Sequence, residues 1–280
     1  MGRQRTAVVT GANSGIGLET ARELARVGYR TLLLCRNAER AAAAKADIDG
    51  SVRGADTEIV LADLGSQAQV RAAAAGIAER LDALDLLVNN AGVTLRKREE
   101  TDEGIDAMLA INHLGPFLLT NLVLPLLHAA PSARIVNVAS DAHKFGTVDL
   151  DDLQATGGYG LLGMPRYGDT KLMNIHFTRE LARRLEGTEV TANSVHPGAV
   201  RTNLGDPPAV VRAVVGLFFQ SPEKGARTSL AAALDPEYAE VSGSYFANGK
   251  PDDGRLAKRA LDDEVARELW DRSAELVGLS

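Results

Sequence analysis

Short apolar runs alternate with longer amphipathic patterns along most of the chain. The runs are Ala7–Thr10, Thr31–Cys35, Glu58–Leu61, Leu84–Asn89, Ala133–Ala139, Val190–Val195 and Ser242–Phe246. Several of them are continuous rather than alternating, which is typical of strands that are covered on both faces. We therefore interpret these runs as buried strands of one sheet.

Helical patterns lie between the runs, with apolar residues three and four positions apart. They include Ile16–Val27, Gln67–Leu81, Asp102–Leu127, Tyr167–Glu186, Pro222–Leu234 and Leu261–Val277. Repeated strand–helix–strand units predict an α/β fold of the doubly wound Rossmann type, with about seven parallel strands flanked by helices. We expect one domain over residues 1–280, of which 255–280 form a C-terminal extension.

Composition narrows the classes of protein. Of the 280 residues 45% are apolar and 24% are charged, and the net charge is −6 without a block of like charges. This argues against nucleic acid or an anionic membrane surface as a partner. The one cysteine, Cys35, cannot form an internal disulfide, and the apolar stretch Ala7–Val9 is too short for a leader or a membrane span. The sequence therefore predicts a cytoplasmic protein without a membrane anchor.

A glycine-rich turn follows the first predicted strand and opens the first predicted helix. Glycines at such a turn allow a sharp bend and a close approach of the backbone to a pyrophosphate, and the helix N-terminus attracts the anion. An ordinary turn is the alternative, but the position between strand and helix favours a dinucleotide site. The residues assigned to this site are Gly11, Asn13, Ser14, Gly15, Ile16 and Gly17.

The end of the second predicted strand separates NAD from NADP. An acidic residue there would bind the ribose 2′-hydroxyl, but this chain has Arg36 and Asn37, with Arg40 one turn further on. A guanidinium at Arg36 can pair with a 2′-phosphate. The alternative is an arginine that is merely solvated. The lack of an acid beside Arg36 favours NADP(H).

Two further strand ends carry candidate contacts to the cofactor. Asp63 and Leu64 follow the third strand, where Asp63 can either cap a helix or bind an adenine amino group. Asn90, Ala91 and Gly92 follow the fourth strand. Small residues there let the backbone approach a ribose, although a turn also favours Asn and Gly.

Four side chains are candidates for catalysis. Tyr167 and Lys171 are four residues apart and share one face of a predicted helix. A tyrosine pKa lies near 10, and a neighbouring ammonium group is expected to lower it toward the working range. Ser140 follows the fifth strand, at the sheet edge where ligands bind in such folds. Asn112 lies among apolar residues in a helical pattern and needs a partner.

Taken together in their order along the chain, these motifs resemble the short-chain dehydrogenase/reductase family from about Thr6 to Phe246. The resemblance implies a catalytic tetrad of Asn112, Ser140, Tyr167 and Lys171. In it Tyr167 exchanges a proton with the substrate oxygen and Ser140 holds that oxygen. Lys171 lowers the tyrosine pKa and binds the nicotinamide ribose, and Asn112 anchors a water molecule.

The same resemblance extends to the segment after the sixth strand. It implies that Pro197, Gly198, Val200 and Thr202 contact the nicotinamide carboxamide, although the Pro-Gly pair is also typical of a turn. The wide, glycine-rich spacer His143–Gly163 and the arginine after the second strand resemble the retinol-dehydrogenase-like branch. That branch implies apolar alcohols, aldehydes or ketones as substrates.

An apolar stretch, Leu204–Gln220, is interpreted as a substrate lid over residues 204–220, with a core helix as the alternative. His113, His143 and His196 lack the spacing of metal ligands, and we expect no metal site.

The leading functional hypothesis is an NADP(H)-dependent oxidoreductase that transfers a hydride between nicotinamide and an apolar alcohol or carbonyl compound, such as an aldehyde, a ketone or a polycyclic molecule. A non-catalytic NADPH-binding scaffold protein is the second hypothesis, and the presence of all four candidate catalytic residues argues against it. A dehydratase or epimerase of the extended type would need a larger C-terminal domain. We expect a homodimer or a homotetramer, as the family suggests.

Overall fold

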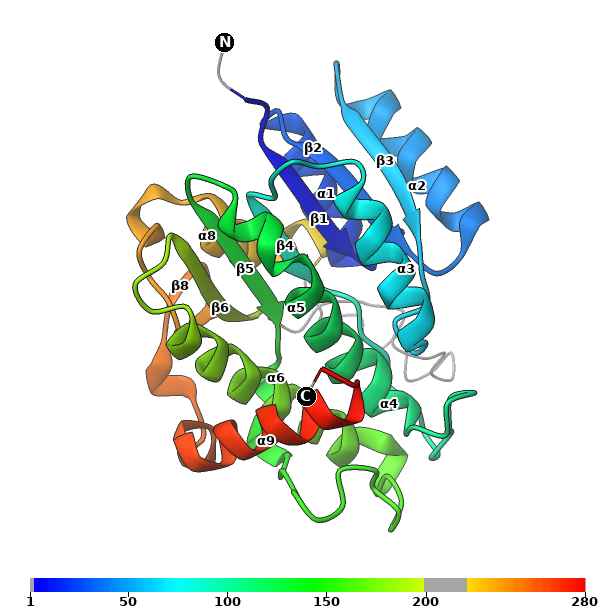
Figure 1. Ribbon diagram of the computed structural model, residues 1–280, viewed down its shortest axis with the longest axis vertical. Helices are drawn as coiled ribbons and strands as arrows, with labels where there is room; N and C mark the ends of the chain where they lie inside the picture. Colours follow the sequence, from blue (N-terminus) through cyan, green and yellow to red (C-terminus); the bar gives the residue numbers. More distant parts are fainter. Residues whose placement is uncertain (1–2, 199–220, 280) are drawn as a thin grey trace.

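The computed structural model describes residues 3–198 and 221–279, and its centre is one eight-stranded sheet (Figure 1). The strand order is β3-β2-β1-β4-β5-β6-β7-β8, and all neighbours pair in parallel except β7 and β8. The strands are β1 Thr6–Thr10, β2 Arg30–Cys35, β3 Asp56–Leu61, β4 Leu86–Asn89, β5 Ala133–Val138, β6 Val190–His196, β7 Tyr245–Ala247 and β8 Lys250–Pro251. The predicted α/β sheet is thus confirmed, with one short antiparallel strand added at its edge.

Helices cover both faces of this sheet. The α-helices are α1 Gly15–Arg26, α2 Ala38–Ser51, α3 Gln67–Ala78, α4 Ala107–Leu109, α5 Gly115–His128, α6 Met164–Arg184, α8 Pro222–Leu234 and α9 Asp263–Leu276. A π-helical turn, Ala110–Leu114, joins α4 to α5. Short 3-10 turns are η2 Asp141–Phe145, η3 Leu161–Gly163, η4 Pro236–Tyr238, η5 Asp253–Arg255 and η6 Lys258–Leu261.

Strand β1 shows how the two layers form. Its side chains alternate between the faces, so that Ala7 and Val9 pack with α1, α2 and α8, whereas Val8 packs with α3, α5, α6 and α9. The strand order reverses between β1 and β4. Crossovers on the two sides of that point run in opposite directions, which leaves a crevice at the carboxyl ends of the strands. The fold therefore places any ligand site where the candidate residues end their strands.

The predicted helix Asp102–Leu127 begins later than expected. Gly104 adopts a left-handed φ of 71° in a turn, and the helix starts only at Ala107, where the Asp106 carboxylate accepts a hydrogen bond of 2.7 Å from Leu109 N. The apolar periodicity of the sequence does not reveal this turn, because Ile105 continues the helical spacing although it lies before the helix. Asp106, at the start of this helix, forms a buried ion pair with Arg166 near the site.

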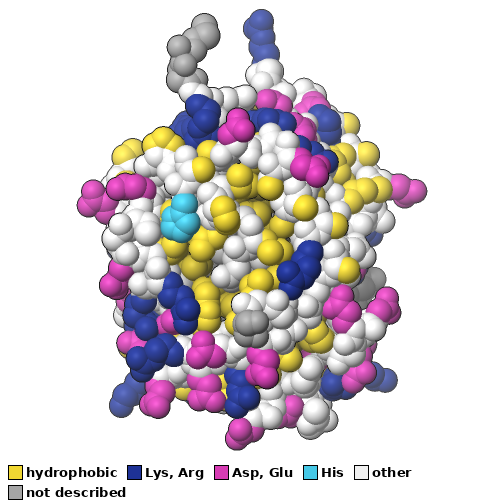
Figure 2. All heavy atoms as spheres, in the orientation of Figure 1, with side chains coloured by type: hydrophobic (Ala, Val, Ile, Leu, Met, Phe, Trp, Pro, Cys, Tyr) yellow, Lys and Arg dark blue, Asp and Glu magenta, His cyan; other side chains and the backbone are white. Residues whose placement is uncertain are grey.

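The face that carries α5, α6 and α9 is shown in Figure 2, where acidic and basic side chains are interspersed around apolar atoms. Helix α9 packs on α6, and its Trp270 contacts the rings of Phe117 and Phe177, with centroids 4.8 and 5.8 Å away. The helical stretch Ala107–His128 is long and apolar enough to cross a membrane, but 78% of its most apolar window is buried inside the fold. Within the described residues this stretch is a core helix.

Candidate active site

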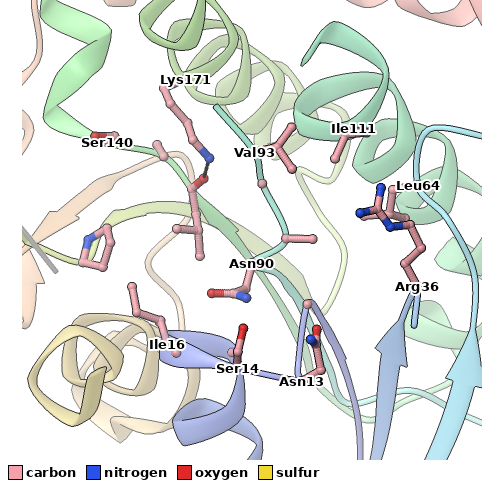
Figure 3. A pocket seen from close by; sticks show the side chains of 18 of the residues that line it. Asn13, Ser14, Ile16, Arg36, Leu64, Asn90, Val93, Ile111, Ser140 and Lys171 are labelled. Carbon is pink, nitrogen blue, oxygen red and sulfur yellow. Dashed lines mark hydrogen bonds between the residues drawn. The ribbon is translucent and has the colours of Figure 1, made fainter. Parts of the chain in front are cut away.

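A cavity of about 920 Å³ runs along the carboxyl edge of the sheet from β2 to β6 (Figure 3). Every candidate site residue in the described ranges lines it except Asn112. Arg36 and Leu64 lie at one end of the view and Ser140 and Lys171 at the other, with Asn90 between them. The lining residues predicted from the sequence are Gly11, Asn13, Ser14, Gly15, Ile16, Gly17, Arg36, Asn37, Asp63, Leu64, Asn90, Ala91, Gly92, Ser140, Tyr167, Lys171, Pro197 and Gly198. Val200, Thr202 and the predicted lid 204–220 lie outside the described residues.

The turn between β1 and α1 has no room for a side chain at Gly11 or Gly17. Gly11 adopts a left-handed φ of 67°, and a Cβ on Gly17 would lie 2.4 Å from the Gly11 carbonyl oxygen and 2.4 Å from Asn90 Nδ2. Ser14 precedes α1 in an extended conformation and makes no side-chain cap with the described residues. The first N–H groups of α1 therefore face the cavity, and this arrangement fits a bound pyrophosphate.

Asn90 fastens this turn to the neighbouring strand. Its Nδ2 donates to Thr10 O at 2.9 Å, while Thr10 Oγ1 accepts from the backbone N–H groups of Asn90 and Ala91 at 2.9 and 3.0 Å. Asn89 joins β4 to β5 in the same way, because its side-chain amide donates a hydrogen bond of 2.8 Å to Asn137 Oδ1. The ends of β1, β4 and β5 are thus held in one register around the cavity floor.

At the β2 end of the cavity two charged side chains meet. Arg36 is 67% exposed, and its Nη1 lies 3.5 Å from Asp63 Oδ2. The other Asp63 oxygen accepts from Gly65 N at 2.9 Å, and the cap of α3 is Ser66, so Asp63 is not a helix cap. Asn37 does cap a helix, because its side chain accepts from Arg40 N at 2.8 Å. Arg36 is therefore a largely free cation at the place that distinguishes the two cofactors.

Tyr167 and Lys171 share one face of α6 as predicted. Burial raises the pKa of Tyr167 to about 12, and the neighbouring Ser140 hydroxyl opposes this rise. Lys171 is only 2% exposed, and burial lowers its pKa to about 8. Its Nζ donates to Val138 O at 2.8 Å and lies 5.4 Å from the centre of the tyrosine ring. In this arrangement the ammonium group is directed at a carbonyl, and a lowering of the tyrosine pKa by Lys171 stays a prediction. The phenol is neutral at pH 7 and has a proton to donate.

Ser140 stands between β5 and the 3-10 turn η2. Its backbone is extended, and its Oγ accepts a hydrogen bond of 3.1 Å from Ala142 N. The Ser140 hydroxyl group neighbours the Tyr167 phenol. Both Ser140 and Tyr167 line this end of the cavity, which places their two hydroxyl groups in reach of one substrate.

Asn112 lies in the π-helical turn and is fully buried. Its Oδ1 accepts from Val93 N at 2.8 Å, and its Nδ2 donates to Val93 O at 2.9 Å and to Thr170 Oγ1 at 3.0 Å. Both amide hydrogens are thus used within the protein. The side chain joins the loop after Gly92 to the catalytic helix, and its role in anchoring water stays a prediction.

Sequence reasoning missed several lining residues. Val93 and Met164 belong to no compact motif, and Asp141 and His196 border the cavity beside Ser140. The position of Asp141 directly after Ser140 was the one local signal. Burial raises the pKa of the Cys35 thiol to about 11. Within residues 3–198 and 221–279 no cluster of His, Cys, Asp and Glu has the arrangement of a metal site.

Comparison with known proteins decides the family. A sequence profile described as short chain dehydrogenase matches residues 5–151. Retinol dehydrogenase 14 of Homo sapiens is 42% identical over 98% of this chain and 87% of its own length. The chain belongs to the short-chain dehydrogenase/reductase family.

Solved structures agree with this assignment. An uncharacterized protein from Mycobacterium Paratuberculosis is 33% identical with a TM-score of 0.78, over 98% of this chain and 94% of that one. A short chain dehydrogenase from Burkholderia cenocepacia J2315, solved in complex with NADP, is 26% identical with a TM-score of 0.71, over 90% of this chain and 98% of that one. This short-chain dehydrogenase is similar to the retinol-dehydrogenase-like branch, and it is an oxidoreductase that acts on CH–OH groups. Its cytoplasmic location and its oligomeric state stay predictions.

Proposed function

We propose that this short-chain dehydrogenase uses NADP(H) and converts an apolar aldehyde or ketone to its alcohol, or the reverse. The observation that carries the choice of cofactor is Arg36 at the mouth of the cavity. It follows β2, no acidic residue lies beside it in the sequence, and Arg40 lines the same end. Its contact with Asp63 is exposed and long, so the guanidinium can turn to a 2′-phosphate at little cost.

The residues present fit a dinucleotide. The glycine turn and the N-terminus of α1 would hold the pyrophosphate, Asn90–Gly92 the nicotinamide ribose and Asp63 with Leu64 the adenine. When it is bound, the reduced dinucleotide supplies the hydride.

Three side chains perform the rest of a carbonyl reduction. The neutral Tyr167 phenol donates its proton to the substrate oxygen, where negative charge develops. The Ser140 hydroxyl donates a hydrogen bond to the same oxygen and holds it in line. The Lys171 ammonium group lies near enough to the ring to stabilise the phenolate that remains.

The apolar class of substrate is supported by the surface next to the catalytic residues. Met164 lines the cavity and is 49% exposed. Leu161 and Leu162, directly before it, are 81% and 59% exposed. Neighbouring exposed apolar side chains at the rim of a cavity favour an apolar ligand.

The choice of cofactor is tested with Arg36→Asp. An aspartate would repel a 2′-phosphate and accept hydrogen bonds from a 2′-hydroxyl, so the ratio of kcat/KM for NADPH to that for NADH should fall by at least tenfold. Arg272→Asp is the matched control, because Arg272 is a half-exposed arginine on α9 that does not line the cavity. An unchanged ratio in Arg36→Asp would remove Arg36 from the cofactor site.

A further inference from the structure

The segment Asp253–Leu261, which we call the C-terminal segment, lies against the turn that carries Ser140. It follows the β7–β8 hairpin and is far from Ser140 in sequence. Its contacts to the turn η2 come from Arg255, Ala257 and Arg259. None of these residues lines the cavity. Their contacts therefore need an explanation other than substrate binding.

His143 is the centre of these contacts and is completely buried. Its Nδ1 lies 2.7 Å from Ser140 O, and its Nε2 lies 3.1 Å from Ala257 N. Because Ala257 N–H is a donor, Nε2 must accept, and the ring hydrogen must lie on Nδ1 and point to Ser140 O. The Ala257 N–H thus fixes one neutral tautomer of the histidine, and that tautomer fixes the serine backbone.

Asp141 provides a second connection to the same segment. Its carboxylate accepts from Tyr245 Oη at 3.0 Å and from the Arg255 guanidinium, and Lys144 Nζ lies 3.4 Å away. Its backbone N–H donates to His196 Nδ1 at 3.2 Å. Burial alone would raise the pKa of Asp141, but the Arg255 hydrogen bond and the surrounding charges lower it to about 2. Asp141, the residue directly after Ser140, is therefore an anion that is fixed by Arg255 of the C-terminal segment and by Tyr245.

The opposite side of the turn rests on the catalytic helix. A Cβ on Gly146 would lie 2.3 Å from the carbonyl oxygen of Gly168, the residue after Tyr167. Arg259 Nη1 donates to Gly146 O at 2.8 Å. The turn η2 is thus held between α6 and the C-terminal segment, so a displacement of that segment would change the distance between Ser140 and Tyr167.

We propose that His143 is a positioning residue for Ser140, and that the C-terminal segment acts on catalysis by holding His143 through Ala257 N–H. This inference rests on the proposed function, in which Ser140 holds the substrate oxygen. Ser140 Oγ is itself bound to Ala142 N within the turn, so its direction follows the direction of the turn. An oxygen held about 1 Å out of place can cost about two orders of magnitude in rate.

Two substitutions separate the two contacts of His143. In His143→Asn the side-chain amide can replace Nδ1 as the donor to Ser140 O, but it is too short to accept a hydrogen bond from Ala257 N–H. In His143→Gln the longer side chain can replace Nε2 as the acceptor for Ala257 N–H, but the hydrogen bond to Ser140 O is lost. We expect both His143→Asn and His143→Gln to lower kcat by about tenfold or more. The dissociation constant of NADPH should stay within about twofold, because the histidine does not line the cavity. Arg272→Gln on α9 is the control and should change neither quantity.

The decisive comparison repeats His143→Asn in a Ser140→Ala background. If the histidine acts through the serine hydroxyl, the second substitution changes the residual kcat by less than about twofold. A general loss of structure would lower kcat by the same factor in both backgrounds, and this result would overturn the proposal.

Hydrogen exchange gives a readout that does not depend on turnover. In His143→Asn the backbone amides of residues 139–146 should exchange several-fold faster, while those of α9 keep their rates. Unchanged exchange in the turn, or full kcat in His143→Asn, would overturn this inference alone. Absence of turnover in the unsubstituted protein would instead count against the proposed function.

Discussion

The two ends of the cavity are built in different ways. At the nucleotide end, around β1 and β2, the fit depends on backbone: glycines without room for a Cβ, free N–H groups of α1 and an exposed arginine. At the catalytic end, around β5 and α6, it depends on buried side chains that bind the backbone of other elements, such as Lys171 and His143, and on the nearby buried ion pair Asp106–Arg166. The nucleotide end has an exposed charged pair, Arg36–Asp63, whereas the charged pair near the catalytic end, Asp106–Arg166, is buried.

This difference indicates what each end must do. A cofactor that enters and leaves needs an accessible cation and a backbone surface of fixed shape. Proton transfer needs hydroxyl groups held within a fraction of an ångström, and buried polar contacts supply that rigidity when all partners are present. Substitutions at the two ends should therefore fail in different ways.

The largest effect is expected at the catalytic end, from Tyr167→Phe. It removes the proton donor and keeps the ring, so kcat should fall by about 10²–10⁴-fold while NADPH affinity stays nearly unchanged. Steady-state kinetics and a fluorescence titration of NADPH measure the two quantities. Retained turnover would show that another group donates the proton.

Asp106→Asn should cause the largest loss of stability. Asp106 is fully buried and accepts from Arg166 Nη2 at 2.9 Å and from the Tyr159 hydroxyl. Its replacement would leave Arg166 with the more distant Asp169, whose Oδ2 lies 3.8 Å from Arg166 Nη1. Loss of one partner from a buried pair costs about 3–5 kcal/mol in the free energy of unfolding. Asp63→Asn, in the exposed pair at the nucleotide end, should cost less than about 1 kcal/mol. Urea denaturation compares them, and equal losses would contradict the contrast between the two ends.

Gly17→Ala should impair the nucleotide end selectively. Its Cβ would overlap the Gly11 carbonyl oxygen, and relieving such a contact costs about 1–3 kcal/mol, seen here as weaker NADPH binding. Gly50→Ala is the matched control, because Gly50 lies on α2 with no atom within 4 Å of the added carbon. Equal NADPH affinities in both variants would mean that the turn can relax.

A smaller effect concerns pH. Burial lowers the pKa values of His113 and His176 to about 4, whereas an unfolded chain protonates its histidines near pH 6.5. Between these values the unfolded state binds more protons, so stability falls as the pH falls. From pH 7 to pH 5.5 we expect a loss of about 1 kcal/mol per histidine. His113→Gln should remove its share of the slope, and a slope that His113→Gln leaves unchanged would contradict the assignment.

The sequence predicts the nucleotide end well, because its signals are local. The glycine turn, Arg36 and Asn90 each follow a strand that an apolar run identifies, and the parallel sheet brings those strand ends together. Helix α2 was not among the patterns, because its alanine-rich sequence buries only Ala41, Ala44 and Ile48 and lacks a marked apolar face. The position of the nucleotide end in the fold could therefore be predicted from the strand ends rather than from the helices.

The supports of the catalytic end escaped prediction for a physical reason. His143 and Ala257 are 114 residues apart, and so are Asp141 and Arg255. No local pattern marks such a pairing, and His143 has the same sequence signature as any buried histidine. The direction of Lys171 likewise depends on Val138 O, a backbone atom from another element. Sequence motifs identify the reacting groups, whereas the contacts that hold these groups in position are seen only in the packed structure.

The central claim is tested most directly by following NADPH and NADH consumption with a panel of apolar aldehydes and ketones, and by quantifying the alcohol formed. The account predicts that NADPH is consumed in a one-to-one ratio with an alcohol product, with a kcat/KM at least tenfold above that for NADH. NADPH that binds tightly without being consumed by any carbonyl compound, or a preference for NADH, would contradict it.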